Sequence, residues 1–133
     1  MTTATFQWPV RVYYEDTDSG GVVYHSIYLN YMERARTEWL RSLGFDQSRL
    51  ARERGLVFAV SQLEVKYLAP AHMDDQLMIT LTLAKRGGAS LHLRQEIHRV
   101  PDDTVLIRAT VRVAMLDGHF KPTRLPSDIL PWG

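Results

Sequence analysis

The sequence predicts one α+β domain, residues 1–133, in which an antiparallel sheet of about five strands wraps around one long central helix. Two kinds of hydrophobic repeat predict these elements. Apolar and polar residues alternate in five separate stretches, which is the period of half-buried strands. Residues 26–43 instead carry apolar side chains at three- and four-residue spacings, the period of an amphipathic helix. A chain of 133 residues can bury a core without disulfides or a structural metal, which fits a single domain.

The first strand and the long helix follow each other in the chain. The alternation from Phe6 to Tyr14 predicts the strand, and Pro9 suits its start or a sheet edge. Ser26 is a candidate cap for the helix, and Gly44 stands where a C-terminal glycine belongs. The helix presents one apolar stripe, made by Tyr28, Tyr31, Met32, Ala35, Trp39 and Leu43.

A short helix and four strands complete the predicted order. The short helix is expected from Asp46, a candidate cap, to Arg54. One face of the second strand is expected to carry Val57, Ala59, Ser61, Leu63, Val65 and Tyr67. The remaining strands centre on residues 77–83, 91–97 and 105–115. Because short turns at 87–88 and 101–103 join these last three, we expect antiparallel pairing.

Composition and charge exclude several classes of function. The net charge is +1, from 16 basic and 15 acidic residues, and no basic block suggests a nucleic-acid footprint. The apolar runs are too short to span a bilayer, and the first residues lack the apolar core of a signal peptide. Without cysteine there is no disulfide framework, thiolate zinc site or cysteine nucleophile. The expectation is a cytoplasmic protein without a nucleic-acid partner, an integral membrane segment, a metal or a cofactor.

Residues 14–25, Y-E-D-T-D-S-G-G-V-V-Y-H, carry the densest functional signal. Two aspartates and two glycines stand here between the first strand and the long helix. The first backbone N–H groups of a helix lack intrahelical partners and carry partial positive charge, so they can hold a developing oxyanion. A nearby carboxylate can act as nucleophile or as general base on water.

Two other interpretations of this segment compete with the catalytic one. Asp, Ser and Gly before a helix are ordinary turn and capping residues, and composition alone favours that interpretation. A calcium loop would begin at Asp16, but its fifth and twelfth positions would be Gly20 and Ile27, so two ligands are missing. No G-x-S-x-G elbow or Walker sequence occurs in the chain.

The stretch from Val12 to Arg36 resembles the signature of the 4-hydroxybenzoyl-CoA thioesterase family, through D-x-D-x-x-G-x-V and a helix carrying E-x-A-R. Similarity to the acyl-CoA thioesterases encoded with the bacterial Tol-Pal envelope system runs end to end, through Y-L-A-P-A to the proline-rich tail. That family has the hotdog fold, which agrees with the element order predicted above. Its members form dimers through their sheets, often pairs of dimers, with active sites at the subunit interface. The resemblance therefore implies a homodimer or homotetramer.

The resemblance also implies roles for individual residues. Asp18, the second acid of the motif, matches the family's catalytic aspartate, acting as general base or nucleophile. The N–H of His25, helped by that of Tyr24, matches the donor that polarises the thioester carbonyl, and His25 matches a histidine given a catalytic role in the Tol-Pal-linked relatives. Asp16 is a candidate turn stabiliser. Tyr14 and Tyr24 are expected to line the acyl pocket, where Ser61 is a further candidate.

A charged turn supplies candidate contacts for the phosphates of CoA. Lys85, Arg86 and Ser90 surround two glycines, which combines two cations, a flexible turn and a hydroxyl. The resemblance implies the same, because relatives use this region for the nucleotide end of CoA. The competing interpretation is a solvated hairpin.

The expected function is hydrolysis of acyl-CoA thioesters, with acyl-carrier-protein thioesters as a second substrate class. One alternative is a module that binds acyl carrier protein or an acyl thioester without chemistry, associated with the Tol-Pal system. Another is a hotdog dehydratase acting on 3-hydroxyacyl thioesters.

Overall fold

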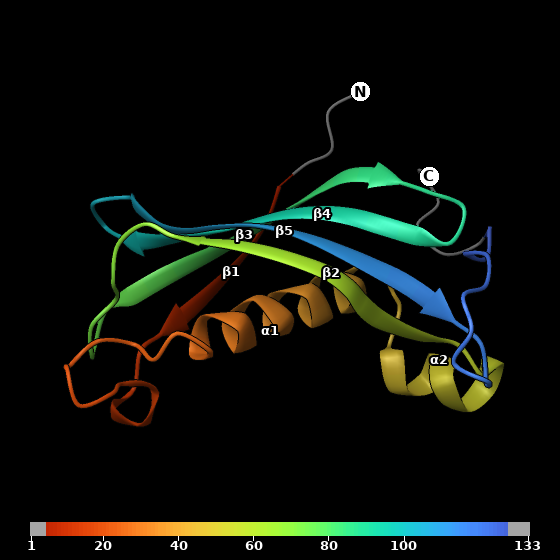
Figure 1. Ribbon diagram of the computed structural model, residues 1–133, viewed down its shortest axis with the longest axis horizontal. Helices are drawn as coiled ribbons and strands as arrows, with labels where there is room; N and C mark the ends of the chain where they lie inside the picture. Colours follow the sequence, from red (N-terminus) through yellow and green to blue (C-terminus); the bar gives the residue numbers. More distant parts are fainter. Residues whose placement is uncertain (1–4, 128–133) are drawn as a thin grey trace.

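The computed structural model describes residues 5–127, which form a sheet curved over one long helix (Figure 1). The strands are β1 (Phe6–Arg11), β2 (Val57–Tyr67), β3 (Gln76–Arg86), β4 (Ser90–Val100) and β5 (Thr104–Leu116). The helices are α1 (Ile27–Ser42) and α2 (Gln47–Arg54), preceded by a 3-10 turn, η1 (Tyr14–Asp16). This confirms the predicted order of elements, although β1 ends at Arg11, earlier than the alternation suggested.

The strands are ordered β1-β3-β4-β5-β2, and every neighbouring pair is antiparallel. β2 does not pair with β3, the next strand in the chain, but lies beside β5 at the opposite edge from β1. The two edge strands are therefore β1, which precedes α1 in the chain, and β2, which follows α2. Pro9 lies in the edge strand β1, where a residue without an N–H is tolerated, as predicted.

A bulge in β2 changes which of its side chains share a face. The pairing with β5 shifts between Val60 and Gln62, so that Ser61 is the extra residue. Val60 pairs with buried Val113 before the bulge, and Leu63 pairs with buried Val111 after it. The strict alternation predicted from residue 57 to residue 67 is wrong, because one inserted residue reverses the facing of every side chain before it.

One face of α1 packs into the core, and no side chain caps the start of the helix. Its buried side chains are Tyr28, Tyr31, Met32, Ala35, Trp39 and Leu40, and the helix packs against β1 and β3. Ser26 already has helical backbone angles (φ −77°, ψ −19°), and its hydroxyl makes no capping hydrogen bond. The predicted side-chain cap is therefore wrong. Gly44 follows the helix with φ +90°, a conformation that favours glycine.

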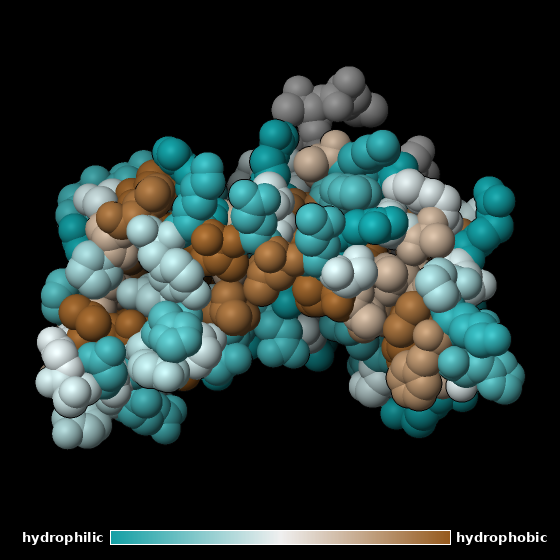
Figure 2. Space-filling model, viewed as in Figure 1, coloured by the Kyte–Doolittle hydropathy of each residue, from teal (hydrophilic) through white to brown (hydrophobic). Residues whose placement is uncertain are grey.

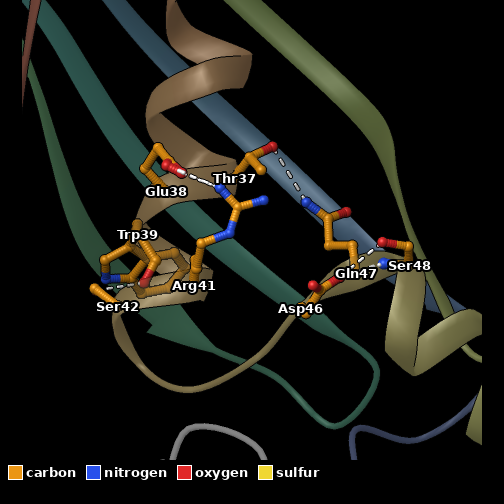
Figure 3. A network of polar contacts seen from close by, with 8 residues as sticks. All are labelled: Thr37, Glu38, Trp39, Arg41, Ser42, Asp46, Gln47 and Ser48. Atoms are coloured by element: carbon orange, nitrogen blue, oxygen red, sulfur yellow. Dashed lines mark hydrogen bonds and ion pairs between the residues drawn. The ribbon is translucent and has the colours of Figure 1, made fainter.

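α2 is held against the end of α1 by a small polar network (Figure 3). The Asp46 carboxylate accepts hydrogen bonds from the N–H groups of Ser48 and Arg49, which confirms it as the cap of α2. The Gln47 amide donates to the hydroxyl of Thr37 on α1 at 3.3 Å. These contacts fix the turn between the helices and leave the start of α1 at the opposite end of the molecule.

One polar pair lies in the core between α1 and β4. Gln95 is only 1% exposed, and its amide donates to the carbonyl of Met32 at 3.0 Å. The guanidinium of Arg36 donates to the Gln95 side-chain oxygen at 2.9 Å. Burial lowers the pKa of Arg36, with the charge of Glu33 opposing that effect. Gln95 thus supplies a neutral acceptor for a cation that has lost much of its contact with water.

We predict that Gln95→Leu lowers the free energy of unfolding by about 2–3 kcal/mol, because the half-buried guanidinium of Arg36 loses its acceptor and the Met32 carbonyl loses a buried second hydrogen bond. Urea denaturation followed by circular dichroism measures this. Gln7→Leu, on the exposed face of β1, is the matched control and should stay within about 0.5 kcal/mol of the parent. Equal stability of the two variants would contradict a stabilising role for Gln95.

Candidate active site

Residues 16–24 form a small antiparallel hairpin between η1 and α1. The Tyr24 N–H donates to the carbonyl of Asp16 at 2.9 Å, and the Asp18 N–H donates to the carbonyl of Val22 at 2.9 Å. The N–H of Gly21 closes the turn on the Asp18 carbonyl at 3.0 Å, with φ +80° at the glycine. Asp18 is therefore carried near the tip, about 7 Å along the ladder from the Asp16–Tyr24 pair.

The Asp18 carboxylate is exposed, and in the described residues only one of its two oxygens accepts a hydrogen bond. One oxygen, Oδ1, accepts the N–H of Gly20 at 2.8 Å, and a Cβ at residue 20 would lie 3.2 Å from it. Within residues 5–127, no group donates a hydrogen bond to Oδ2. Burial raises the pKa of Tyr28, and the negative charge of Asp18 adds a smaller increase. One carboxylate oxygen is thus oriented by the turn and the other is available for chemistry.

The two residues just before α1 offer unpaired backbone donors. In the described part of the chain, no acceptor lies within hydrogen-bonding distance of the N–H groups of His25 and Ser26. The Tyr24 N–H is different, because Asp16 already accepts it at 2.9 Å. The N–H groups of His25 and Ser26 are therefore available to a ligand, whereas that of Tyr24 is already used within the hairpin. Sequence reasoning did not single out the Ser26 N–H, and the role of His25 as the donor to the thioester stays a prediction.

Asp16 ties the hairpin to α1, a role beyond the turn stabilisation predicted for it. Its Oδ2 accepts the hydroxyl of Tyr31 at 2.7 Å and the N–H of Tyr13 at 3.0 Å. Burial raises the pKa of Tyr31, and the hydrogen bond to the negatively charged Asp16 raises it further, so this phenol remains a donor. Because Tyr31 lies one turn inside α1, the bond sets the position of the hairpin relative to the helix start.

Two further tyrosines fix the backbone around His25. The Tyr67 hydroxyl, from the last residue of β2, donates to the carbonyl of His25 at 3.1 Å. The Tyr28 hydroxyl accepts the N–H of Ala71 at 3.0 Å, and its ring meets that of Tyr67 edge to face at 5.9 Å. In sequence, both tyrosines look like ordinary members of apolar repeats. Only the fold shows that their hydroxyls reach the candidate site.

The side chains of Tyr14, Tyr24 and His25 lie at the same end of the molecule as Asp18. Tyr14 is 80% exposed on η1, and the Tyr24 ring lies 4.4 Å from the His25 ring, centroid to centroid. All three side chains are exposed in a single chain.

The remaining predicted residues lie elsewhere in the chain. Ser61 occupies the β2 bulge, where its hydroxyl donates to the carbonyl of Arg112 at 3.3 Å, roughly 20 Å along the strand from Tyr67. Lys85 and Arg86 end β3 at the opposite end of the sheet from the hairpin (Figure 1). Ser90 is 6% exposed with its hydroxyl against Gly87, which does not favour the predicted phosphate contact.

Within residues 5–127, no set of three or more His, Asp or Glu side chains is placed to hold a metal ion. None of the helices in that part of the chain combines the length and the apolar character needed to cross a membrane.

Comparison with known proteins identifies the class. The thioesterase-like superfamily profile matches residues 12–133. The acyl-CoA thioesterase YbgC of Haemophilus influenzae is 46% identical over 125 residues, 93% of this chain and 90% of that protein. The acyl-CoA thioester hydrolase YbgC of Escherichia coli O6:H1 is 47% identical over 131 residues, 98% and 96% of the two chains. A crystal structure of a 4-hydroxybenzoyl-CoA thioesterase variant with 4-hydroxybenzoyl-CoA shares the fold, with a TM-score of 0.89, 18% identity and 96% coverage of each chain.

The chain therefore belongs to the thioesterase-like superfamily. Its sheet wrapped around α1 is the hotdog fold, as the resemblance implied. Its relatives at 46–47% identity are the YbgC thioesterases, which are named as catalysts rather than as binding modules. These comparisons do not support the non-catalytic alternative, and the link to the Tol-Pal system stays a prediction.

We predict that Tyr31→Phe lowers the free energy of unfolding by about 2 kcal/mol, because a partly buried hydrogen bond to a carboxylate is lost. Thermal and urea denaturation measure the change. Tyr14→Phe removes an equivalent hydroxyl from an exposed ring and should leave stability unchanged. If both variants unfolded like the parent, the Tyr31–Asp16 bond would not anchor the hairpin.

Proposed function

We propose that this protein is an acyl-CoA thioesterase, which hydrolyses the thioester to a free acid and the thiol of CoA at the site formed by Asp18 and the start of α1. One observation carries the proposal: an open carboxylate oxygen lies on a hairpin that is fixed beside two unpaired backbone N–H groups. The YbgC relatives support the acyl-CoA substrate class. Acyl-carrier-protein thioesters are the second substrate class that we propose to test.

The chemistry follows from charge developing on the thioester oxygen. The His25 N–H donates to that oxygen, and the partial positive charge of the helix start stabilises the oxyanion of the tetrahedral intermediate. Asp18 either attacks the carbonyl carbon, which gives an acyl-aspartyl anhydride that water cleaves, or removes a proton from the attacking water. In both routes the intermediate collapses by breaking the carbon–sulfur bond, and the thiolate leaves. The His25 imidazole can return a proton to that thiolate.

We also propose that two copies pair through β2 to complete the site. The edge strand and the segment after it expose an apolar patch, the β2 patch, of which each member is at least 40% exposed: Val60, Leu63, Tyr67 and Leu68. Figure 2 shows apolar side chains gathered in a band along β2 on this face. An uncovered patch on an unpaired sheet edge is typical of an interface.

Pairing of this kind would unite residues that one chain keeps apart. When two edge strands pair antiparallel about a two-fold axis, the start of one lies beside the end of the other. Ser61 and the cations Lys85 and Arg86 of a second copy would then approach the end of the sheet that carries Asp18. A single copy cannot supply both groups, because they lie at opposite ends of its sheet. The proposed assembly is a homodimer, or a homotetramer built from two such pairs.

We predict that Leu63→Asp yields single chains and abolishes turnover, because pairing would bury two unpaired carboxylates. Sedimentation velocity measures the assembly, and thiol release measures activity. Gln7→Asp places the same charge on the opposite edge strand and should leave both unchanged. An active single chain would contradict a shared site.

We predict that Asp18→Asn lowers kcat roughly 10²–10⁴-fold while stability is retained, since the amide can neither attack nor accept a proton. Thiol release from acyl-CoAs of increasing length, and from the matching acyl-carrier-protein thioesters, measures the loss and ranks the two carriers. Asp74→Asn alters an exposed acid that faces no substrate group in this proposal and should keep full activity. Parental turnover by Asp18→Asn would remove Asp18 from the mechanism.

A further inference from the structure

The free N–H groups of His25 and Ser26, just before α1, belong to consecutive peptide groups. The Tyr24 carbonyl, which shares a peptide with the His25 N–H, accepts the N–H of Ile27 at 2.9 Å. The His25 carbonyl, which shares a peptide with the Ser26 N–H, accepts the hydroxyl of Tyr67 at 3.1 Å. Each peptide therefore has an occupied acceptor and a vacant donor. A hydrogen bond at a peptide carbonyl polarises the N–H of the same peptide and strengthens the bond that it donates.

The local backbone keeps both donors available to one ligand. The bond from Ile27 to Tyr24 closes a turn in which His25 and Ser26 are the two central residues. Ser26 has φ −77° and ψ −19°, close to the values of the helix that follows. The turn is thus a first, tightened turn of α1, whose N–H groups have no intrahelical acceptor.

Tyr67 is held so that its hydroxyl stays on the His25 carbonyl. Its ring packs edge to face on Tyr28 at 5.9 Å, and Tyr28 is itself fixed by the N–H of Ala71. The ring position is therefore set by α1 and by the segment after β2, not by the hydroxyl. Removing the hydroxyl alone should leave the ring, the strand and the helix in place.

We propose that Tyr67 is a positioning residue for thioester hydrolysis, which orients and polarises the His25–Ser26 peptide so that the Ser26 N–H is a second donor to the thioester oxygen. The inference rests on the proposed function, because it needs that oxygen to lie at the start of α1. Two donors match a tetrahedral oxyanion better than one, and their contribution grows as charge develops on the oxygen. Tyr67 therefore acts on kcat more than on substrate binding.

The test compares Tyr67→Phe with Tyr13→Phe, whose side chain is 61% exposed and which, unlike Tyr67, makes no hydrogen bond to the His25 carbonyl. Tyr67→Phe should lower kcat about tenfold with KM changed less than twofold, while the control keeps both values. Sedimentation velocity and thermal unfolding confirm that the assembly and the fold are those of the parent. A parental kcat for Tyr67→Phe would overturn the inference.

A spectroscopic measurement separates polarisation from a structural effect. Benzoyl-CoA bound to the inactive Asp18→Asn variant should show its thioester carbonyl stretch at lower frequency than in water. Adding Tyr67→Phe should reduce that shift, whereas adding Tyr13→Phe should not. An unchanged shift in the Tyr67→Phe double variant would overturn the role of Tyr67 and leave the proposed function intact. Full activity of Asp18→Asn alone would instead refute the proposed function.

Discussion

The hydrogen bond from the buried Tyr31 hydroxyl to the Asp16 carboxylate is the contact on which the candidate site depends. It joins the acid hairpin to α1 one turn inside the helix, and the Asp16 carbonyl meanwhile accepts the N–H of Tyr24. The hairpin therefore cannot shift along the helix without breaking a partly buried, charge-assisted bond, which is costly. This constraint holds the hairpin that carries Asp18 at the start of α1, where we propose that the two act together.

Three tyrosine hydroxyls each form a hydrogen bond with a backbone or carboxylate group around the candidate site, and none of them takes the place of a substrate there. Tyr31 engages Asp16, Tyr28 engages the Ala71 N–H, and Tyr67 engages the His25 carbonyl. The second Asp18 oxygen and the N–H groups of His25 and Ser26 stay without a partner in the described residues, and we propose that a substrate engages them. A site whose polar groups are oriented in advance does not need to reorganise as charge develops, which is the main source of electrostatic catalysis. The β2 patch, by contrast, is unsatisfied in one chain, which is why we propose that a second copy covers it.

Much of the fold could be predicted because its repeats are long and regular. The stripe of α1 and the alternation of β3 to β5 each continue over several turns or residue pairs, so single exceptions do not hide them. Two features were missed for a physical reason. The bulge at Ser61 depends on pairing with β5, and the lack of a side-chain cap at Ser26 depends on how the hairpin enters the helix. Neither feature can be recognised from the residues of the local sequence alone.

The sequence alone determined the element order, the acid-rich turn before the main helix and, through its resemblance, the thioesterase class. These depend on neighbours in the chain, whose spacing the period of a helix or strand dictates. The tertiary structure decided which edge β2 occupies, which backbone donors remain unpaired, and that Tyr31 and Tyr67 reach the site from α1 and β2. Such contacts join residues far apart in sequence, so the direction of a hydroxyl becomes defined only when the sheet has closed over the helix.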